Sequence, residues 1–204
     1  MEYLVQIKAG DRQLLAGIDD AMTEAARRSG EWLVCRPGCT QCCIGPFAIT
    51  QLDALRLREG LAALAGIDPA RAEAVRARAA GYVAATAPVY PGNSATGELW
   101  DEERLPPSMD DLPCPALDPD TGCCDLYAAR PITCRTFGPV THVGDETLGA
   151  CELCYGGATD DEIAQCAVKI DPEGLESKLL AALDGEGLSG MTIVAYALAP
   201  KNGL

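Results

Sequence analysis

The chain has 204 residues, of which 48% are hydrophobic, so it can bury a core without covalent cross-links. Its formal net charge of -14 disfavours nucleic acid and anionic membrane surfaces as partners. The N-terminus lacks the basic and apolar parts of a signal peptide, and the apolar run "MTIVAYALA" is shorter than the roughly 20 residues of a membrane span. We therefore predict a cytoplasmic protein that contacts neither nucleic acid nor membrane.

Helical patterns precede and follow the first cysteines. Apolar residues recur at helical spacing over residues 11–29, which predicts a first helix there. Thr50 is a favourable N-cap and predicts the start of a second helix. Asp68 and Pro69 are typical of a cap and a first helical position, so we predict a third helix that ends near Ala87.

The remaining segments have weaker periodicity. Residues 88–113 hold five of the fourteen prolines, which predicts a long loop with one helical turn near Trp100. Another helix is predicted to open at Asp171 and Pro172, as the third one does at its own Asp-Pro pair. The last segment, residues 189–200, suits either a buried helix or a buried strand.

Eleven cysteines give the strongest chemical signal. They are Cys35, Cys39, Cys42, Cys43, Cys114, Cys123, Cys124, Cys134, Cys151, Cys154 and Cys166. A reducing cytosol disfavours disulfides, and an odd number of cysteines cannot all pair within one chain. Two Cys-x2-Cys spacings, at Cys39 with Cys42 and at Cys151 with Cys154, are typical of metal sites. These features predict metal binding, with redox cysteines or buried thiols as the alternative.

The adjacent pairs Cys42-Cys43 and Cys123-Cys124 raise the question of how many centres there are. Successive side chains point in different directions, so we expect one member of each pair to lie away from the first ion. That member would serve a second centre, stand beside the first centre as an extra thiol, or pack as a small buried hydrophobe.

Arginines lie near the thiols in the sequence, whereas the chain has a single imidazole group. Arg130 and Arg135 flank Cys134, and we expect their guanidinium groups to donate to thiolate or cluster sulfur. His142 is the only histidine, so any Cys-His or Ser-His catalytic pair would have to use it. We expect it to be a solvated loop residue, with metal ligation as the alternative.

The motifs "CRPGCTQCC" and "CPALDPDTGCCDLYAARPITCRTFG" together resemble the family of zinc- or iron-chelating domains named CxxCxxCC. The resemblance implies Cys39, Cys42, Cys43, Cys114, Cys124, Cys134 and the pair Arg130-Pro131 as site residues. The first spacing here is Cys-x3-Cys, and Cys123 is an additional cysteine. The family is related to the cysteine-rich region of flagellin lysine N-methylases, where an iron-sulfur cluster is associated with methyl transfer.

These observations predict a mainly α protein, a single compact helical domain over residues 1–204 with cysteine-rich loops assembled around a metal site within residues 35–154. The predicted metal ligands are Cys35, Cys39, Cys42, Cys43, Cys114, Cys124, Cys134, Cys151 and Cys154. The predicted cofactor is zinc or iron, with an iron-sulfur cluster as one form of the iron. A zinc-stabilised interaction module and a metal carrier without catalysis are the alternatives. No reaction, substrate or protein partner follows from the sequence.

Overall fold

A computed structural model describes residues 2–36 and 38–200, and its contacts divide the chain into two compact units. The first unit combines the N-terminal segment through Arg36 with Ile132–Gly187. The second combines the segment that ends at Pro131 with the C-terminal segment from Leu188. Because each unit takes two separate stretches of chain, neither is a contiguous domain. The single domain predicted over residues 1–204 stays a prediction.

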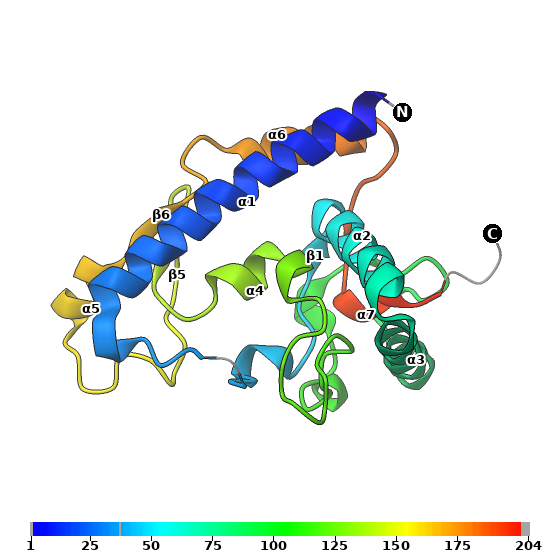
Figure 1. Ribbon diagram of the computed structural model, residues 1–204, viewed down its shortest axis with the longest axis horizontal. Helices are drawn as coiled ribbons and strands as arrows, with labels where there is room; N and C mark the ends of the chain where they lie inside the picture. Colours follow the sequence, from blue (N-terminus) through cyan, green and yellow to red (C-terminus); the bar gives the residue numbers. More distant parts are fainter. Residues whose placement is uncertain (1, 37, 201–204) are drawn as a thin grey trace. The chain divides into compact units, whose positions relative to one another are not determined.

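The first unit is built along one long helix, α1 (Glu2–Ser29), shown in blue in Figure 1. Ile7, Leu14, Ile18 and Ala25 lie on one stripe of this helix and are buried. The hydroxyl of Tyr3 donates a 2.7 Å hydrogen bond to the carbonyl of Ala182 in α6 (Leu175–Asp184), so α6 packs along α1. The predicted helix over residues 11–29 is confirmed, and it begins nine residues earlier.

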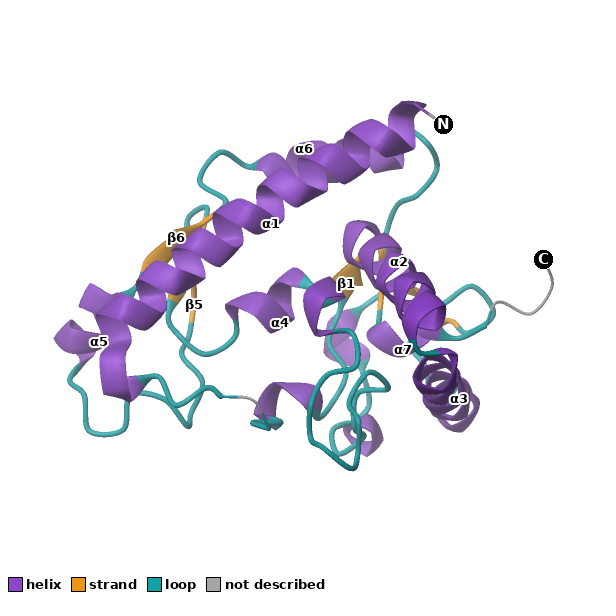
Figure 2. Cartoon of the chain, in the orientation of Figure 1, coloured by secondary structure: helices purple, strands orange, loops and turns teal. Residues whose placement is uncertain are grey.

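Short elements complete the first unit, and Figure 2 shows how much of the chain between them is loop. They are η1 (Gly30–Trp32), α4 (Ile132–Thr136), β4 (Thr141–Val143), β5 (Glu146–Leu148), α5 (Asp160–Cys166), β6 (Val168–Ile170) and α6 (Leu175–Asp184). The strands form a sheet in the order β5-β4-β6, antiparallel between β4 and β5 and parallel between β4 and β6. Thr159 and Glu162 form a capping box at the start of α5.

Two helices joined by one residue dominate the second unit. They are α2 (Gln51–Ile67) and α3 (Pro69–Thr86). The Thr50 side chain accepts from the amide of Asp53, and the Asp68 side chain accepts from the amide of Arg71. Both predicted caps and both helices are therefore confirmed. The two helices pack on each other and on α7 (Val194–Leu198), which places the core of this unit among them.

A small sheet and single turns form the rest of the second unit. Its strands are β1 (Ile49–Thr50), β2 (Gly92–Asn93), β3 (Glu98–Leu99) and β7 (Met191–Thr192), in the order β1-β7-β3-β2. The 3-10 turns are η2 (Gln41–Cys43), η3 (Glu102–Arg104), η4 (Pro107–Met109) and η5 (Tyr127–Ala129). The predicted loop over residues 88–113 thus contains a β-hairpin, and its helical turn lies just after Trp100, at η3.

Two local predictions differ from the structure in detail. Asp171 does not open a helix: its carboxylate accepts from the amides of Leu175 and Glu176, so it caps α6 from four residues upstream. Residues 189–200 contain both a strand and a helix, β7 and α7. No helix in the described part of the chain is both long and apolar enough to cross a membrane.

Candidate metal centre

Cys42 and Cys43 face each other in one tight turn of the second unit. The turn η2 is closed by a 2.8 Å hydrogen bond from the amide of Cys43 to the carbonyl of Thr40. The hydrogen bond between the two thiols lowers the pKa of Cys42 to about 6, and the charge of Arg130 acts in the same direction. The same hydrogen bond, burial and the neighbouring thiols raise the pKa of Cys43. The 3-10 turn brings both thiols together although the residues are adjacent. That one member of the pair lies away from the first ion stays a prediction.

A second segment with a cysteine pairs directly with this turn. The amide of Cys114 donates to the carbonyl of Cys43 at 2.7 Å, and the amide of Gly45 donates to the carbonyl of Leu112 at 2.9 Å. Ile44 and Pro113 form an isolated β-bridge between them. The backbone therefore holds Cys43 and Cys114 side by side across the long insertion of residues 44–113.

A hairpin-like loop returns the chain to the same place. Leu117 and Cys124 form a β-bridge, and the amide of Asp125 donates to the carbonyl of Ala116 at 2.7 Å. The Cys124 side chain packs on the core around α2 and α3. The Cys123 thiol instead contacts the carbonyl of Thr121 in its own loop, at 3.8 Å. The two members of this pair thus diverge, as expected from their adjacency.

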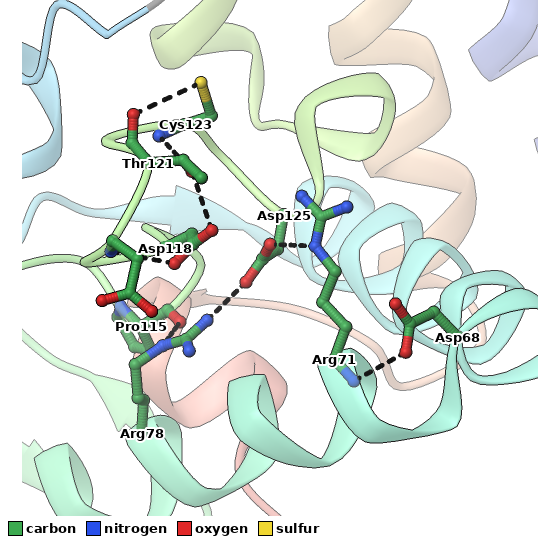
Figure 3. Close-up of polar contacts among 9 residues, drawn as sticks. Asp68, Arg71, Arg78, Pro115, Asp118, Thr121, Cys123 and Asp125 are labelled. Atoms are coloured by element: carbon green, nitrogen blue, oxygen red, sulfur yellow. Dashed lines mark hydrogen bonds and ion pairs between the residues drawn. The ribbon is translucent and has the colours of Figure 1, made fainter.

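The buried carboxylate of Asp125 fixes this loop to α3 (Figure 3). Its side chain is only 1% exposed and pairs with both Arg71 and Arg78, two turns apart on one face of α3. The second pair has a distance of 2.5 Å. Arg78 also donates to the carbonyl of Pro115 at 2.8 Å. Because Asp125 directly follows Cys124, these ion pairs hold the Cys124 backbone in position.

Burial and charge act on the thiols of this unit in opposite directions. Burial raises the pKa of Cys114 to about 11, and it raises the pKa of Cys124 too. The positive charge of Arg130 lowers the pKa of Cys124 and of Cys42. The guanidinium carbon of Arg130 lies 3.9 Å from the centroid of the Tyr127 ring, so a cation-π contact holds this charge near the thiols.

We call Cys42, Cys43, Cys114 and Cys124 the four-thiol cluster. Four partly or largely buried thiols with one nearby arginine are a donor set suited to zinc or iron. Their mutual effects on pKa place them in one environment. Within residues 2–36 and 38–200, however, no three Cys, His, Asp or Glu side chains are in position to hold an ion. Metal binding by this cluster therefore requires the thiols to turn toward a common point.

A small cavity adjoins the cluster. It has a volume of about 20 Å³, which is room for one water-sized group, and its lining includes Cys114, Tyr82 and Phe47. The hydroxyl of Tyr82 is buried and has no hydrogen-bond partner within the described residues. Burial, followed by the influence of Cys114, raises the pKa of Tyr82 to about 12. An uncharged phenol thus stands beside the Cys114 thiol.

A family model matches most of the cysteine-bearing part of the chain. The family model CxxCxxCC, described as "putative zinc- or iron-chelating domain", matches residues 34–155. The chain belongs to this family. No match was found among curated proteins or among solved structures.

The match to the CxxCxxCC family includes every cysteine except Cys166, and the structure distributes these cysteines over both units. The second unit holds Cys39, Cys42, Cys43, Cys114, Cys123 and Cys124; the first holds Cys35, Cys134, Cys151, Cys154 and Cys166. Cys39 lies between Gly38 and Thr40, which both pack close to Gly122 in the hairpin loop. Its role as a ligand stays a prediction, as does that of Cys134.

The predicted residues of the first unit have contacts of their own. Cys35 and Cys154 lie with their sulfur atoms 4.0 Å apart, and Cys151 is buried beside Cys154. Arg135 is buried and pairs with Asp19 of α1 at 3.0 Å, which is a structural contact within this unit. His142 lies in β4 rather than in a loop, and its Nδ1 is 2.9 Å from the hydroxyl of Thr147.

The sequence pattern does not indicate that Asp125, Arg71 and Arg78 hold the backbone at Cys124 in position. One signal was present: the two arginines are seven residues apart on a predicted helix, which places them on one face. Their common partner, however, lies some fifty residues away and carries no pattern of its own. Only the folded hairpin loop brings these three residues together.

Proposed function

We propose that the second unit binds one zinc or iron ion through the four-thiol cluster of Cys42, Cys43, Cys114 and Cys124. The observation that carries this proposal is the convergence of three backbone segments on one place, each bringing a cysteine. The membership of the chain in a zinc- or iron-chelating family supports it independently. Arg130 would offset part of the negative charge that four thiolates place on one divalent ion.

The contact between Cys42 and Cys43 favours a single ion over a cluster with inorganic sulfide. A zinc-sulfur bond of about 2.3 Å places two ligands of one tetrahedral ion about 3.8 Å apart. Two thiols that already hydrogen-bond to each other need little movement to reach that separation. Once bound, such an ion would supply structural stabilisation and would be redox-silent if it is zinc.

The test is metal and sulfide analysis of the full chain purified without oxygen, with two matched variants. Cys124→Ser removes a proposed ligand, whereas Cys123→Ser changes the adjacent cysteine, whose thiol contacts its own loop. We expect wild type and Cys123→Ser to hold the same amount of zinc or iron, and Cys124→Ser to hold one equivalent less.

Equal metal loss in the two variants would contradict this assignment of ligands. Wild-type protein with neither zinc nor iron would contradict the proposed function itself. Acid-labile sulfide in stoichiometric amount would show that the chain binds an iron-sulfur cluster and not a single ion.

A further inference from the structure

We propose that Cys35 and Cys154 of the first unit form a reversible disulfide, a redox site that is independent of the proposed metal centre. Their sulfur atoms are 4.0 Å apart although 119 positions separate them in the chain. Both are thiols in this structure. The exposed Cys35 and the buried Cys154 thus form a contact that only the fold creates.

The backbone around the two cysteines is held from both sides. The amide of Tyr155 donates to the carbonyl of Trp32 at 2.9 Å, and the rings of these two residues are 6.4 Å apart. The hydroxyls of Tyr155 and Ser29 lie 2.6 Å from each other. The segment that carries Cys35 therefore runs beside the segment that carries Cys154.

The local turn also leaves room for the two sulfur atoms. The amide of Cys154 donates to the carbonyl of Cys151 at 2.8 Å, and the amide of Cys151 donates to the carbonyl of Gly138 at 2.9 Å. A Cβ atom at Gly138 would lie 2.9 Å from the sulfur of Cys35, and the φ of +127° at this glycine disfavours any side chain. Glycine at this position keeps the space beside Cys35 open.

Two sulfur atoms in contact are the geometric requirement of a disulfide. Cys151 lies in the same buried group as Cys154, and within the described ranges no three Cys, His, Asp or Glu side chains are in position to hold an ion. A disulfide needs only two sulfur atoms, and rotation of the side chains must shorten their separation to about 2.05 Å. The pair already lies within reach of that change.

The oxidant is a low-molecular-weight disulfide, such as oxidised glutathione. The exposed Cys35 thiolate attacks one sulfur of this disulfide, breaks its S–S bond and releases one thiolate. The Cys154 thiolate then attacks the Cys35 sulfur, which forms the protein disulfide and releases the second thiolate. The two protons of the protein thiols go to the two leaving thiolates, so two protein thiols are oxidised and one small disulfide is reduced.

The test treats the metal-loaded full chain with oxidised glutathione and maps the products by mass spectrometry. We expect a cross-linked peptide pair that contains Cys35 and Cys154, with the loss of two hydrogen atoms, and its disappearance after reduction. Cys35→Ser and Cys154→Ser should both abolish this product, whereas Cys151→Ser, the matched control in the same turn, should retain it. In Cys154→Ser we expect a glutathione adduct to accumulate on Cys35.

Three outcomes would overturn the inference. One is a disulfide that joins Cys151 to either cysteine in place of the Cys35–Cys154 bond. Another is that both thiols stay reduced in folded wild-type protein, at a concentration of oxidised glutathione that does oxidise the unfolded chain. The third is the loss of a metal equivalent in Cys35→Ser or Cys154→Ser, because these thiols would then be ligands. The metal content of Cys124→Ser is measured separately, so the metal-binding proposal and the disulfide proposal can fail independently of each other.

Discussion

The amide of Cys114 donates a hydrogen bond to the carbonyl oxygen of Cys43, and this contact helps to join the two halves of the four-thiol cluster. All of residues 44–113 lie between them, including the α2–α3 hairpin. The cluster is therefore positioned by main-chain pairing before any metal acts on it. Metal binding would then require only that the cysteine side chains rotate toward a common point.

Replacing Asp125 with Asn should loosen the Cys124 loop. The variant keeps the shape of the side chain but removes the charge that pairs with Arg71 and Arg78. Because these arginines remain partly solvated, we expect the free energy of unfolding to fall by only about 1–3 kcal/mol. Urea unfolding measures this change, and Asp120→Asn, at an exposed position in the same loop, is the control. An unchanged midpoint for Asp125→Asn would show that the ion pairs do not hold the loop.

In metal-free protein, the Cys42 thiol should ionise less readily when either Cys43 or Arg130 is replaced. The contact with Cys43 is the main cause of the pKa of about 6, and the charge of Arg130 is a smaller one. Loss of either should raise the pKa of Cys42, so at pH 7 less thiolate is present and alkylation of Cys42 is slower. We expect a larger rise for Cys43→Ala than for Arg130→Gln.

The pH profile of iodoacetamide labelling at Cys42, read by peptide mapping, gives the midpoint in each variant. Arg104→Gln is the control, because Arg104 is an exposed residue paired with Asp101. A midpoint that moves equally in all three variants would mean that Cys42 responds to overall charge and not to its neighbours.

Metal removal should release the cysteine segments while leaving α1 folded. The segments around Cys43 and Cys114 consist of turns and single bridges, whereas the buried stripe of α1 packs within the other unit. Thiols must lose protons to bind metal, so a chelator should extract it more readily at pH 6 than at pH 8. Hydrogen exchange should then rise at the amides of Cys43 and Cys114 and stay slow in the middle of α1. Uniform exchange along the whole chain would contradict this expectation.

Cys166→Ser should be tolerated. Cys166 is buried at the end of α5, and its thiol lies 3.4 Å from the carbonyl of Arg28, a contact that a serine hydroxyl can reproduce. We expect unchanged metal content and a loss of less than about 1.5 kcal/mol in the free energy of unfolding. Cys166→Val cannot donate a hydrogen bond. Thermal unfolding of the Ser and Val variants therefore distinguishes the contribution of this hydrogen bond from that of packing. Loss of metal in Cys166→Ser would instead make this thiol a ligand.

Local signals in the sequence predicted the helices well. Thr50 and Asp68 cap α2 and α3 as expected, because capping depends on residues within one turn. The position of Asp171 was harder to predict, since its carboxylate caps α6 from upstream with the backbone at a φ of +47°. His142 lies in a strand because β4 pairs with β6, a partner distant in the chain.

The grouping of the thiols was only partly accessible from sequence. Spacing placed Cys42 and Cys43 in one early group, yet nothing in it distinguished a turn that unites their thiols from one that separates them. Cys35 belongs to the same group in sequence but lies against Cys154, because a contact across 119 positions leaves no local pattern. A local turn determined the first outcome, and a long-range contact determined the second.

The insertion of the α2–α3 hairpin between Cys43 and Cys114 also sets an order of events during synthesis. At about 5–20 residues per second, Cys114 leaves the ribosome roughly 4–14 seconds after Cys43. For that interval the nascent chain displays the Cys42 and Cys43 thiols without their later neighbours. Protection of the early cysteines from premature oxidation or from the wrong ion thus falls to the cell's thiol and metal pools until the second half of the cluster has emerged.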